Sequence, residues 1–541
     1  MRNILNKLIL KIWHAPWHLI APGVLGCLIP MLIASSRWPS PSMHDDFGNL
    51  LVASTLLEGR LTNPTPSAWE SLETFHVVMQ PTYASKYPIG LGFFLAVGKL
   101  VTGSYAAGLW IVSGLASASV AWMVAGAFSK RCAALSGLFT ASHPYWQNGW
   151  SQEYTNGWLA VLGISLVIGG FLRLHRFGKS ANNGFLRTRM AIVGLGTGAV
   201  FAFYSRPFEG GVVCVLLGFM FLPLVLRRKL LGQPWFWRSA LPGIVVLILG
   251  LSFQLMVNRA VTGTWKQLPY QLHETQYGVA PVLIWQAPHE PTLGHRFTEQ
   301  AQFHRGWSMD AYNKAASWSG YANTLRVRVM SLKNHWGNGL LLTSLFALFL
   351  SKPRRLIWGF AAVAILSLLV INCIPWTIPQ YVSPIIPIAI LLSCFGLKRI
   401  QRYWLRLVTL KANRSLATWM IGLVLIGWNV ALTASIAWDR MSRSSGWEET
   451  WAERRVQIAE QLSEIPGPDL VLVRYQKEHD IVNQEWVFNE ANVDTTQVLW
   501  ARGDGGPLDQ NLRRAYPDRK IWRLEFLPSG RETLQELTDG F

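Results

Sequence analysis

Charged residues are scarce in this chain of 541 residues. Only 15% of the residues are Asp, Glu, Lys or Arg, whereas 50% are hydrophobic and the mean hydropathy is +0.23. This shortage excludes a soluble protein of this length, because soluble domains carry about 25% charged residues. Several apolar runs are long enough to cross about 30 Å of hydrocarbon. The composition therefore predicts an α-helical polytopic membrane protein, and the 27 Trp fit the preference of indole rings for the membrane–water interface.

Cysteine is also rare. All five Cys lie in or beside apolar runs, and no two have the CxxC spacing. The sequence thereby excludes a disulfide framework and a zinc site built on thiolates. No pair of His has the HExxH spacing of a zinc helix, although five of the 12 His fall between 273 and 335. A divalent metal ion is left as an open alternative.

Acidic residues are few relative to basic ones, and the formal charge is +19. The segment 437–541 alone has 13 Lys and Arg against 19 Asp and Glu. The positive excess therefore lies in the rest of the chain, mostly in short connections between apolar runs. This distribution is the positive-inside pattern of membrane proteins and argues against a nucleic-acid partner.

The basic clusters fall on one side of the membrane if about eleven runs span it. The N-terminus is then cytoplasmic and the C-terminus lies outside. The expected spans are near 17–36, 104–127, 132–150, 154–172, 188–204, 208–226, 239–257, 336–351, 356–373, 382–397 and 415–436. The run 88–101 is short for a span and is expected to lie at the outer interface.

Two units follow from this topology. Residues 1–436 form the transmembrane module, with a first outer loop at 37–103 and a second at 258–335. Residues 437–541 are expected to form a small soluble extracytoplasmic α/β domain with an accessory role. Its expected elements are helices over 447–463 and 507–515 and strands near 471–473, 497–500 and 521–524.

Two adjacent acids, Asp45 and Asp46, follow the first apolar run. Neighbouring side chains point in different directions, so at most one carboxylate can face a given reacting atom. A carboxylate at this boundary is suited to act as a general base. The structural alternative is that one of the two acids caps a helix that begins at Phe47.

Other polar residues gather in segments expected on the outer face. Lys86 stands between Tyr83 and Tyr87 and is suited to binding a phosphate, or to snorkelling at the interface. Arg206 and Glu209 lie at a junction between two spans, where they bind phosphate or pair with each other. The candidates for substrate binding are Tyr83, Glu209, Tyr270, His273, Glu274 and Tyr381.

Taken together, these residues resemble the GT-C superfamily of membrane glycosyltransferases, in particular the protein mannosyltransferases, the lipid A aminoarabinose transferases and the glycosyltransferase 39-like proteins. Asp45 and Asp46 match the family's acids at the start of the first outer loop, and Lys86-Tyr87-Pro88 continues the match. Ile89 departs from the family's Tyr-Pro-Pro, and Gln380 replaces the His or Arg that often precedes Tyr381. The resemblance covers about 17–400.

The resemblance implies an inverting transfer of a hexosyl or pentosyl group from a polyprenyl-phosphate-linked sugar to an extracytoplasmic hydroxyl. The lack of cysteines in the outer segments fits a bacterial inner membrane. It implies two catalytic acids, Asp45 as the base and Asp46 to orient Asp45 or a sugar hydroxyl. Lys86, Tyr87 and Arg206 are then expected at the donor phosphate. Two alternatives from other classes are a transporter or flippase for a lipid-linked glycan and a non-catalytic scaffold. Few charged residues occur inside the expected spans, which favours the enzyme over the transporter.

Overall fold

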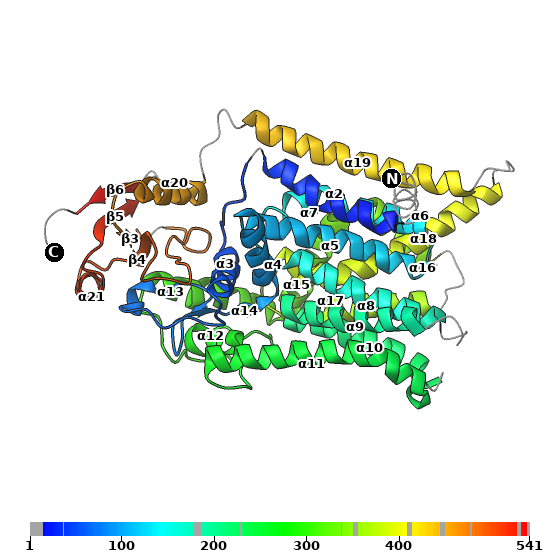
Figure 1. Cartoon of the computed structure of the whole chain (residues 1–541), viewed down its shortest axis with the longest axis horizontal. Helices are drawn as coiled ribbons and strands as arrows, with labels where there is room; N and C mark the ends of the chain where they lie inside the picture. The colour runs from blue at the N-terminus through cyan, green and yellow to red at the C-terminus, as the bar shows by residue number, and fades with distance from the viewer. Residues whose placement is uncertain are drawn as a thin grey trace, which may run out of the picture.

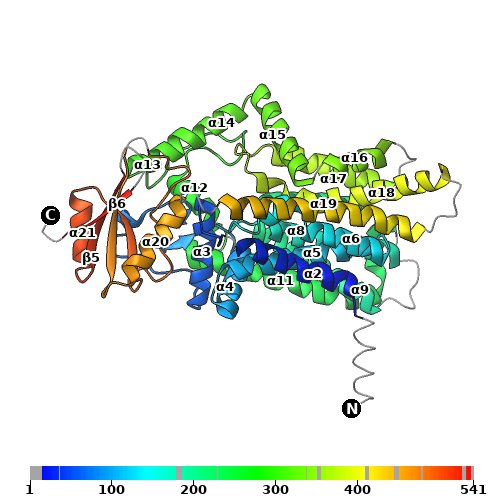
Figure 2. The same ribbon diagram turned by 90° about the horizontal axis from the view of Figure 1, so that it is seen from above.

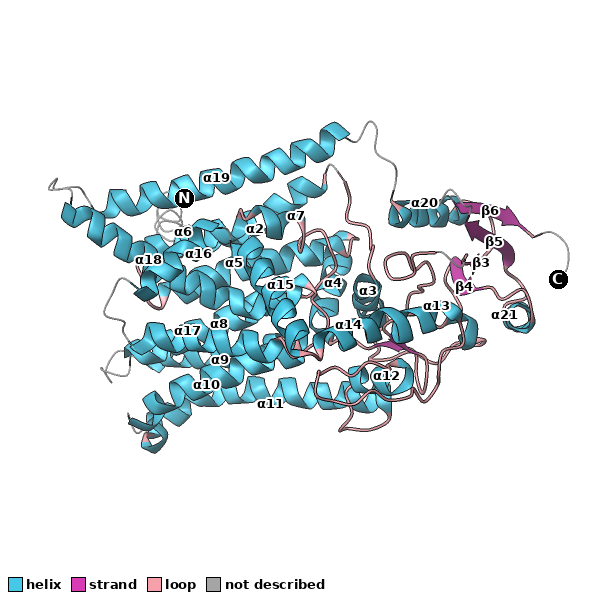
Figure 3. Ribbon diagram, turned by 180° about the vertical axis from the view of Figure 1, so that it is seen from behind, coloured by secondary structure: helices cyan, strands magenta, loops and turns pink. Residues whose placement is uncertain are grey.

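Most of the chain is helical, and its four-stranded sheet lies at one end of the molecule (Figures 1 and 3). The computed structural model describes residues 15–35, 37–177, 185–227, 230–336, 338–349, 355–407, 414–443, 450–476, 479–526 and 532–537.

Seven helical segments of the described chain are long and apolar enough to cross a membrane. They are α2 (Trp17–Ala34), α5 (Ala106–Ala125), α8 (Gly157–Phe177), α9 (Phe185–Ser205), α10 (Pro207–Arg227), α11 (Pro234–Thr262) and the joined segment η5 (Pro379–Ile385) and α18 (Ile386–Leu407). Figure 1 shows them side by side along the long axis of the molecule. They coincide with seven of the eleven expected spans.

The other four expected spans lie outside these seven segments. Three of them coincide with α16 (Asn338–Phe349), α17 (Arg355–Ile371) and α19 (Arg414–Arg443). The prediction of one continuous span over 132–150 is wrong, because α6 ends at Ala141 and α7 covers Pro144–Asn148. Pro144 lacks a backbone N–H and disfavours a helical conformation at His143, which explains the break. The run 88–101 forms the short helix α4 (Ile89–Thr102).

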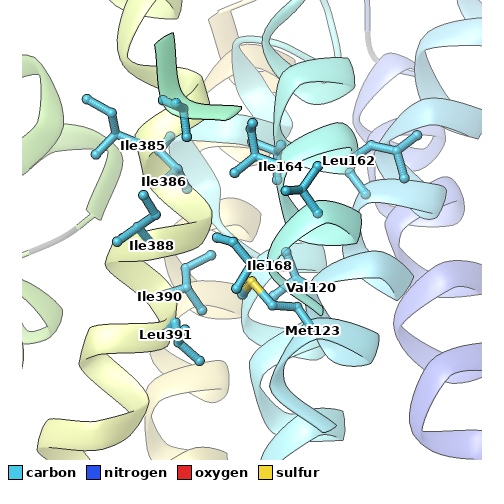
Figure 4. Close-up of a cluster of buried hydrophobic side chains, with 14 of the residues drawn as sticks. Val120, Met123, Leu162, Ile164, Ile168, Ile385, Ile386, Ile388, Ile390 and Leu391 are labelled. Atoms are coloured by element: carbon cyan, nitrogen blue, oxygen red, sulfur yellow. The ribbon is translucent and has the colours of Figure 1, made fainter. Parts of the chain in front are cut away.

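The largest core cluster lies between α5, α8, α10, α17 and the η5–α18 segment. Its aliphatic side chains interlock, as Figure 4 shows for Val120 and Met123 of α5 against Ile164 and Ile168 of α8 and Ile388 of α18. Close approach of α8 and α9 depends on a small residue, since a Cβ on Gly163 would lie 2.6 Å from the backbone nitrogen of Ala202.

The segments between the apolar helices build a layer at the same end as the strands. The first loop forms α3 (His44–Leu57), η1 (Trp69–Leu72), β1 (Val77–Val78), β2 (Ala84–Ser85) and α4. The second loop forms α12 (Pro269–Tyr277), α13 (Thr298–Ala301), the π-helix η4 (Gln302–Ser308), α14 (Met309–Ala315) and α15 (Trp318–Trp336). In Figure 2, α14 and the start of α15 arch away from the other helices.

A four-stranded sheet in the order β4-β3-β5-β6 forms the far end of the chain. Its elements are α20 (Trp451–Ser463), β3 (Asp469–Arg474), β4 (Val498–Arg502), α21 (Pro507–Ala515), β5 (Lys520–Phe526) and β6 (Glu532–Glu536). β3 runs parallel to β4 and β5, and β6 is antiparallel to β5.

The two faces of this sheet have different partners. Because side chains alternate along a strand, Val471 and Val473 pack with the α20 side, whereas Leu470 and Leu472 point to the opposite face. That second face shares one hydrophobic cluster with the first loop, including Phe47 of α3. The sheet of the carboxyl-terminal segment therefore packs against α3, the helix that carries the two adjacent acids.

Candidate active site

The carboxylate of Asp45 lies in the first turn of α3 and is held from several sides. The Tyr87 hydroxyl donates a hydrogen bond to Asp45 Oδ1, and Gln380 Nε2 donates to Oδ2 over 3.0 Å. His76 Nε2 lies 3.6 Å from Oδ1. The Asp45 side chain retains 18% exposure, so it faces accessible space. The positive end of the helix dipole favours its charge there.

Asp46 points elsewhere. Its Oδ2 accepts hydrogen bonds from the backbone nitrogens of Ser42 (2.9 Å) and Met43 (3.1 Å), and the residue is fully buried. This is the arrangement of a helix cap, the structural alternative that the sequence left open for one of the two acids. Burial raises the pKa of Asp46 to about 7, although the two amide hydrogen bonds act in the opposite direction.

Lys86 follows β2 and forms a buried ion pair with α12. Its Nζ lies 3.2 Å from Glu274 Oε1, and the two side chains are 7% and 15% exposed. The ring centroid of Tyr270 lies 4.7 Å from Nζ and that of Tyr87 lies 5.9 Å away, which adds cation–π attraction. His273 Nδ1 lies 3.4 Å from the same Glu274 oxygen. Burial alone would raise the pKa of Glu274, but Lys86 and His273 together lower it below its ordinary range.

A second group of polar residues surrounds Tyr381, next to the Gln380 that binds Asp45. Arg206 lies between α9 and α10, its Nη1 donates to Glu209 Oε1 over 3.1 Å, and its guanidinium lies 4.7 Å from the Tyr381 ring centroid. Arg328 of α15 lies 5.5 Å from the same ring. Arg328 is 2% exposed and donates from Nη2 to two backbone carbonyls.

An apolar groove opens beside these residues. Lys86, Tyr87 and Tyr270 line one part of it together with Arg60. The remainder is mostly apolar and is lined by side chains of α3, α4 and α11, including Val52, Leu56, Ile89, Val257 and Val261. A cationic rim on an apolar groove is suited to a ligand with an anionic head and a hydrocarbon tail.

Comparison with solved structures identifies the architecture. ArnT from Cupriavidus metallidurans bound to undecaprenyl phosphate superposes with a TM-score of 0.52 and 13% identity, covering 95% of this chain and 94% of that one. The Archaeoglobus fulgidus oligosaccharyltransferase in complex with Zn and sulfate superposes with a TM-score of 0.50 and 12% identity, covering 94% of this chain and 68% of that one. Both neighbours are GT-C glycosyltransferases. This chain has the GT-C fold.

Sequence comparison adds nothing to this assignment of the GT-C fold. No family model and no curated protein matches the sequence. The predicted resemblance to GT-C glycosyltransferases is thus confirmed at the level of the fold, by structures of low sequence identity.

The GT-C fold brings most of the predicted site residues together. Residues from the first loop, the second loop and the span junctions meet around Asp45 and the groove: Tyr87, Lys86, Tyr270, His273, Glu274, Tyr381, Arg206 and Glu209. Tyr83, predicted to bind substrate, lies apart from them. Its hydroxyl donates to the backbone carbonyl of Asn489 over 2.7 Å, and its ring belongs to the cluster beneath the carboxyl-terminal sheet.

Sequence reasoning missed three residues of this site. Gln380 was noted only as a departure from the family pattern, yet it binds the Asp45 carboxylate. His76 and Arg328 carried no local signal, because a single His in a loop and a single Arg in a helix occur in any chain. Within the described ranges, no group of three or more His, Cys, Asp or Glu is arranged to hold a metal ion.

Proposed function

We propose that this protein transfers a sugar from a polyprenyl-phosphate-linked donor to a hydroxyl of an extracytoplasmic acceptor, with inversion at the anomeric carbon. The observation that carries the proposal is the position of Asp45, held by Tyr87 and Gln380 beside a groove that joins a cationic rim to an apolar interior. The GT-C fold of the neighbours supports an enzyme rather than a transporter or a scaffold. One neighbour holds undecaprenyl phosphate, a ligand of this chemical class.

In the proposed reaction Asp45 acts as the general base. It accepts the proton of the acceptor hydroxyl while the acceptor oxygen bonds to the anomeric carbon and the bond to the phosphate oxygen breaks. General-base assistance of this kind accelerates reactions by about 10²–10⁴-fold. The Tyr87 and Gln380 donors fix the direction of the carboxylate, so that one arrangement is ready before substrate binds.

Lys86 and Arg206 are proposed to bind the departing polyprenyl phosphate, with Tyr87 beside them. Negative charge grows on the phosphate oxygens as the bond breaks, and prearranged cations stabilise that charge. Both cations already have carboxylate partners, Glu274 and Glu209, which keep them oriented in the absence of donor. The polyprenyl tail would occupy the apolar part of the groove.

The proposed topology places this site outside the cytoplasm in a bacterial inner membrane, with the N-terminus inside. The last turns of α8 and α10 carry Arg176 and Arg227, and both helices have their other ends near the site. Basic residues at the ends remote from the site fit the positive-inside rule. The carboxyl-terminal sheet would then lie outside, on the same side as Asp45.

The deciding experiment measures release of polyprenyl phosphate from a panel of polyprenyl-phosphate sugars by purified protein in lipid, with cell-envelope extract as the source of acceptor. We expect release by the wild type and by Asp46→Asn, and a loss of about 10²–10⁴-fold in Asp45→Asn. Equal release by wild type and Asp45→Asn would refute the assignment of the base. No release by the wild type with any donor would refute the proposed reaction.

A further inference from the structure

His76 has an unusual backbone conformation. Its φ is +64°, and among the described residues only Ala68 shares a positive φ without being glycine. A residue other than glycine adopts a positive φ only rarely, although Asn, Asp and His do so more often than the other residue types. The strain of such a conformation is held in place by the surrounding structure and is concentrated at functional sites. The position of the imidazole therefore calls for an explanation.

The strained residue connects the two residues proposed to do the chemistry. Its carbonyl oxygen accepts a hydrogen bond from the Lys86 backbone nitrogen over 3.0 Å. Its Nε2 lies 3.6 Å from Asp45 Oδ1. Its ring meets the Tyr87 ring edge-on, with centroids 5.6 Å apart and an angle of 81°. One residue thus contacts Asp45, the Tyr87 that binds Asp45, and the backbone of Lys86.

The groups around the imidazole favour its neutral form. Burial lowers the pKa of His76 well below its ordinary value, and the Lys86 cation and the rings of His44, His273 and His304 act in the same direction. Asp45 is the acidic group that faces it. Nδ1 is buried and has no hydrogen-bond partner among the described residues. The tautomer that fits has its proton on Nε2, directed at the carboxylate.

We propose that His76 is a positioning residue for Asp45: its neutral imidazole directs Nε2–H at Oδ1 from 3.6 Å, and this contact shortens to a hydrogen bond when substrate is bound. This inference rests on the proposed function, in which Asp45 is the base. A neutral donor orients a carboxylate without forming an ion pair with it, so Asp45 keeps its capacity to accept a proton. The three donors Tyr87, Gln380 and His76 then define one orientation of the carboxylate, and the strained backbone is what brings the third donor into place.

The left-handed conformation at this position allows a clean test, because His76→Gly removes the ring and is compatible with the backbone. We expect turnover to fall by about 10- to 100-fold, the loss that corresponds to one hydrogen bond to a charged group. The Kd for undecaprenyl phosphate, used as the probe of donor binding, should stay within about threefold of the wild-type value, because this substitution leaves the Lys86 side chain in place. Added imidazole should restore part of the turnover, and more so as pH rises and imidazole becomes neutral.

Two further variants serve as controls for this test. His76→Asn keeps an N–H donor and tolerates a positive φ, so it should retain more turnover than His76→Gly. Ala68→Gly makes a comparable backbone change at the other strained position and should leave turnover unchanged. Wild-type turnover in His76→Gly would overturn the inference, as would parallel loss of donor binding and turnover without rescue by imidazole. A wild type that releases no polyprenyl phosphate would instead overturn the proposed function, and this inference with it.

Discussion

Asp45 and Asp46 illustrate how adjacent residues of the same type acquire different roles. Asp45 keeps partial exposure and contacts side chains from two distant segments, whereas Asp46 is buried against the backbone at the start of its own helix. The difference arises from helix geometry, because the third helical residue is the one whose side chain reaches back to the preceding amides. Substitution of each acid should therefore have a different consequence.

Asp46 should make the stability of the protein depend on pH. Its pKa in the fold is raised to about 7 from an ordinary 3.8, so folding favours the protonated acid. The stability that it contributes is fully present below 3.8 and is lost as pH rises through about 7. We expect Asp46→Asn to flatten the pH dependence of Tm over this window and to preserve turnover. Tryptophan-fluorescence melts at a series of pH values measure the effect.

The controls for this prediction come from the same pair of residues. Asp46→Ala removes the titrating group and the cap together, so it should flatten the pH dependence as Asp46→Asn does and be less stable than Asp46→Asn by about 0.5–2 kcal/mol at every pH in the series. Asp45→Asn should leave the melting curve close to that of the wild type while it lowers turnover by about 10²–10⁴-fold. A pH dependence of Tm that is identical in wild type and Asp46→Asn would contradict the role given to Asp46.

At the scale of elements, the Lys86–Glu274 pair joins the end of β2 to α12. Removal of one partner of a buried ion pair leaves the other without compensation and costs about 3–5 kcal/mol. We expect Lys86→Met and Glu274→Gln each to lower Tm, and the double variant to recover most of that loss. Donor binding should be lost in Lys86→Met and should not return in the double variant. This separation of stability from donor binding is the measurable signature of a phosphate ligand.

Recovery of donor binding in the Lys86→Met/Glu274→Gln double variant would contradict the assignment of Lys86 to the phosphate. In that case its function would be limited to holding α12 in place. Undecaprenyl phosphate is the suitable probe for both measurements, because it contains the phosphate and the tail without the sugar.

The groove makes a prediction that concerns α11. Val257 lines the groove, whereas Val245 lies on the same helix and is 42% exposed. Val257→Trp should fill part of the space and raise KM for donors with long prenyl chains more than for donors with short ones. Val245→Trp is the matched control and should change neither the KM for donors with long prenyl chains nor the KM for donors with short ones. Equal effects of Val257→Trp on long and short donors would contradict the placement of the tail.

The elements were largely predictable from the sequence, whereas their partners were not. Apolar periodicity and basic clusters located seven segments that meet the requirements of a span, and short apolar runs located β3, β4 and β5. The break before Pro144 could have been predicted from proline alone. The contact between Gln380 and Asp45 could not have been predicted, because the two residues are 335 positions apart in the sequence. Neither residue lies in a local pattern that indicates the other as its partner.

At the scale of the whole molecule, the same limit applies to the carboxyl-terminal segment. The sequence predicted a separate accessory domain from its acidic composition and its α/β pattern. The structure packs the sheet of this segment against the first loop, with Phe488 stacked on Phe47 of α3 at 4.2 Å between ring centroids, a contact that the sequence did not predict. Arg455 lies 5.0 Å from the Phe47 ring, and Arg37 pairs with Glu453. Composition and periodicity indicate which secondary structure a segment forms, but they do not indicate which surface of the protein that segment packs against.

This packing predicts that the carboxyl-terminal segment affects turnover through α3. Phe488→Ala removes the ring that stacks on Phe47, two residues from Asp45, and should lower both Tm and turnover per folded molecule. Leu524→Ala is the matched control, because Leu524 is fully buried on the opposite face of the sheet with α20. It should lower Tm and leave turnover per folded molecule unchanged. If Phe488→Ala also spared turnover, the sheet would be a stable neighbour of α3 that does not set the position of Asp45.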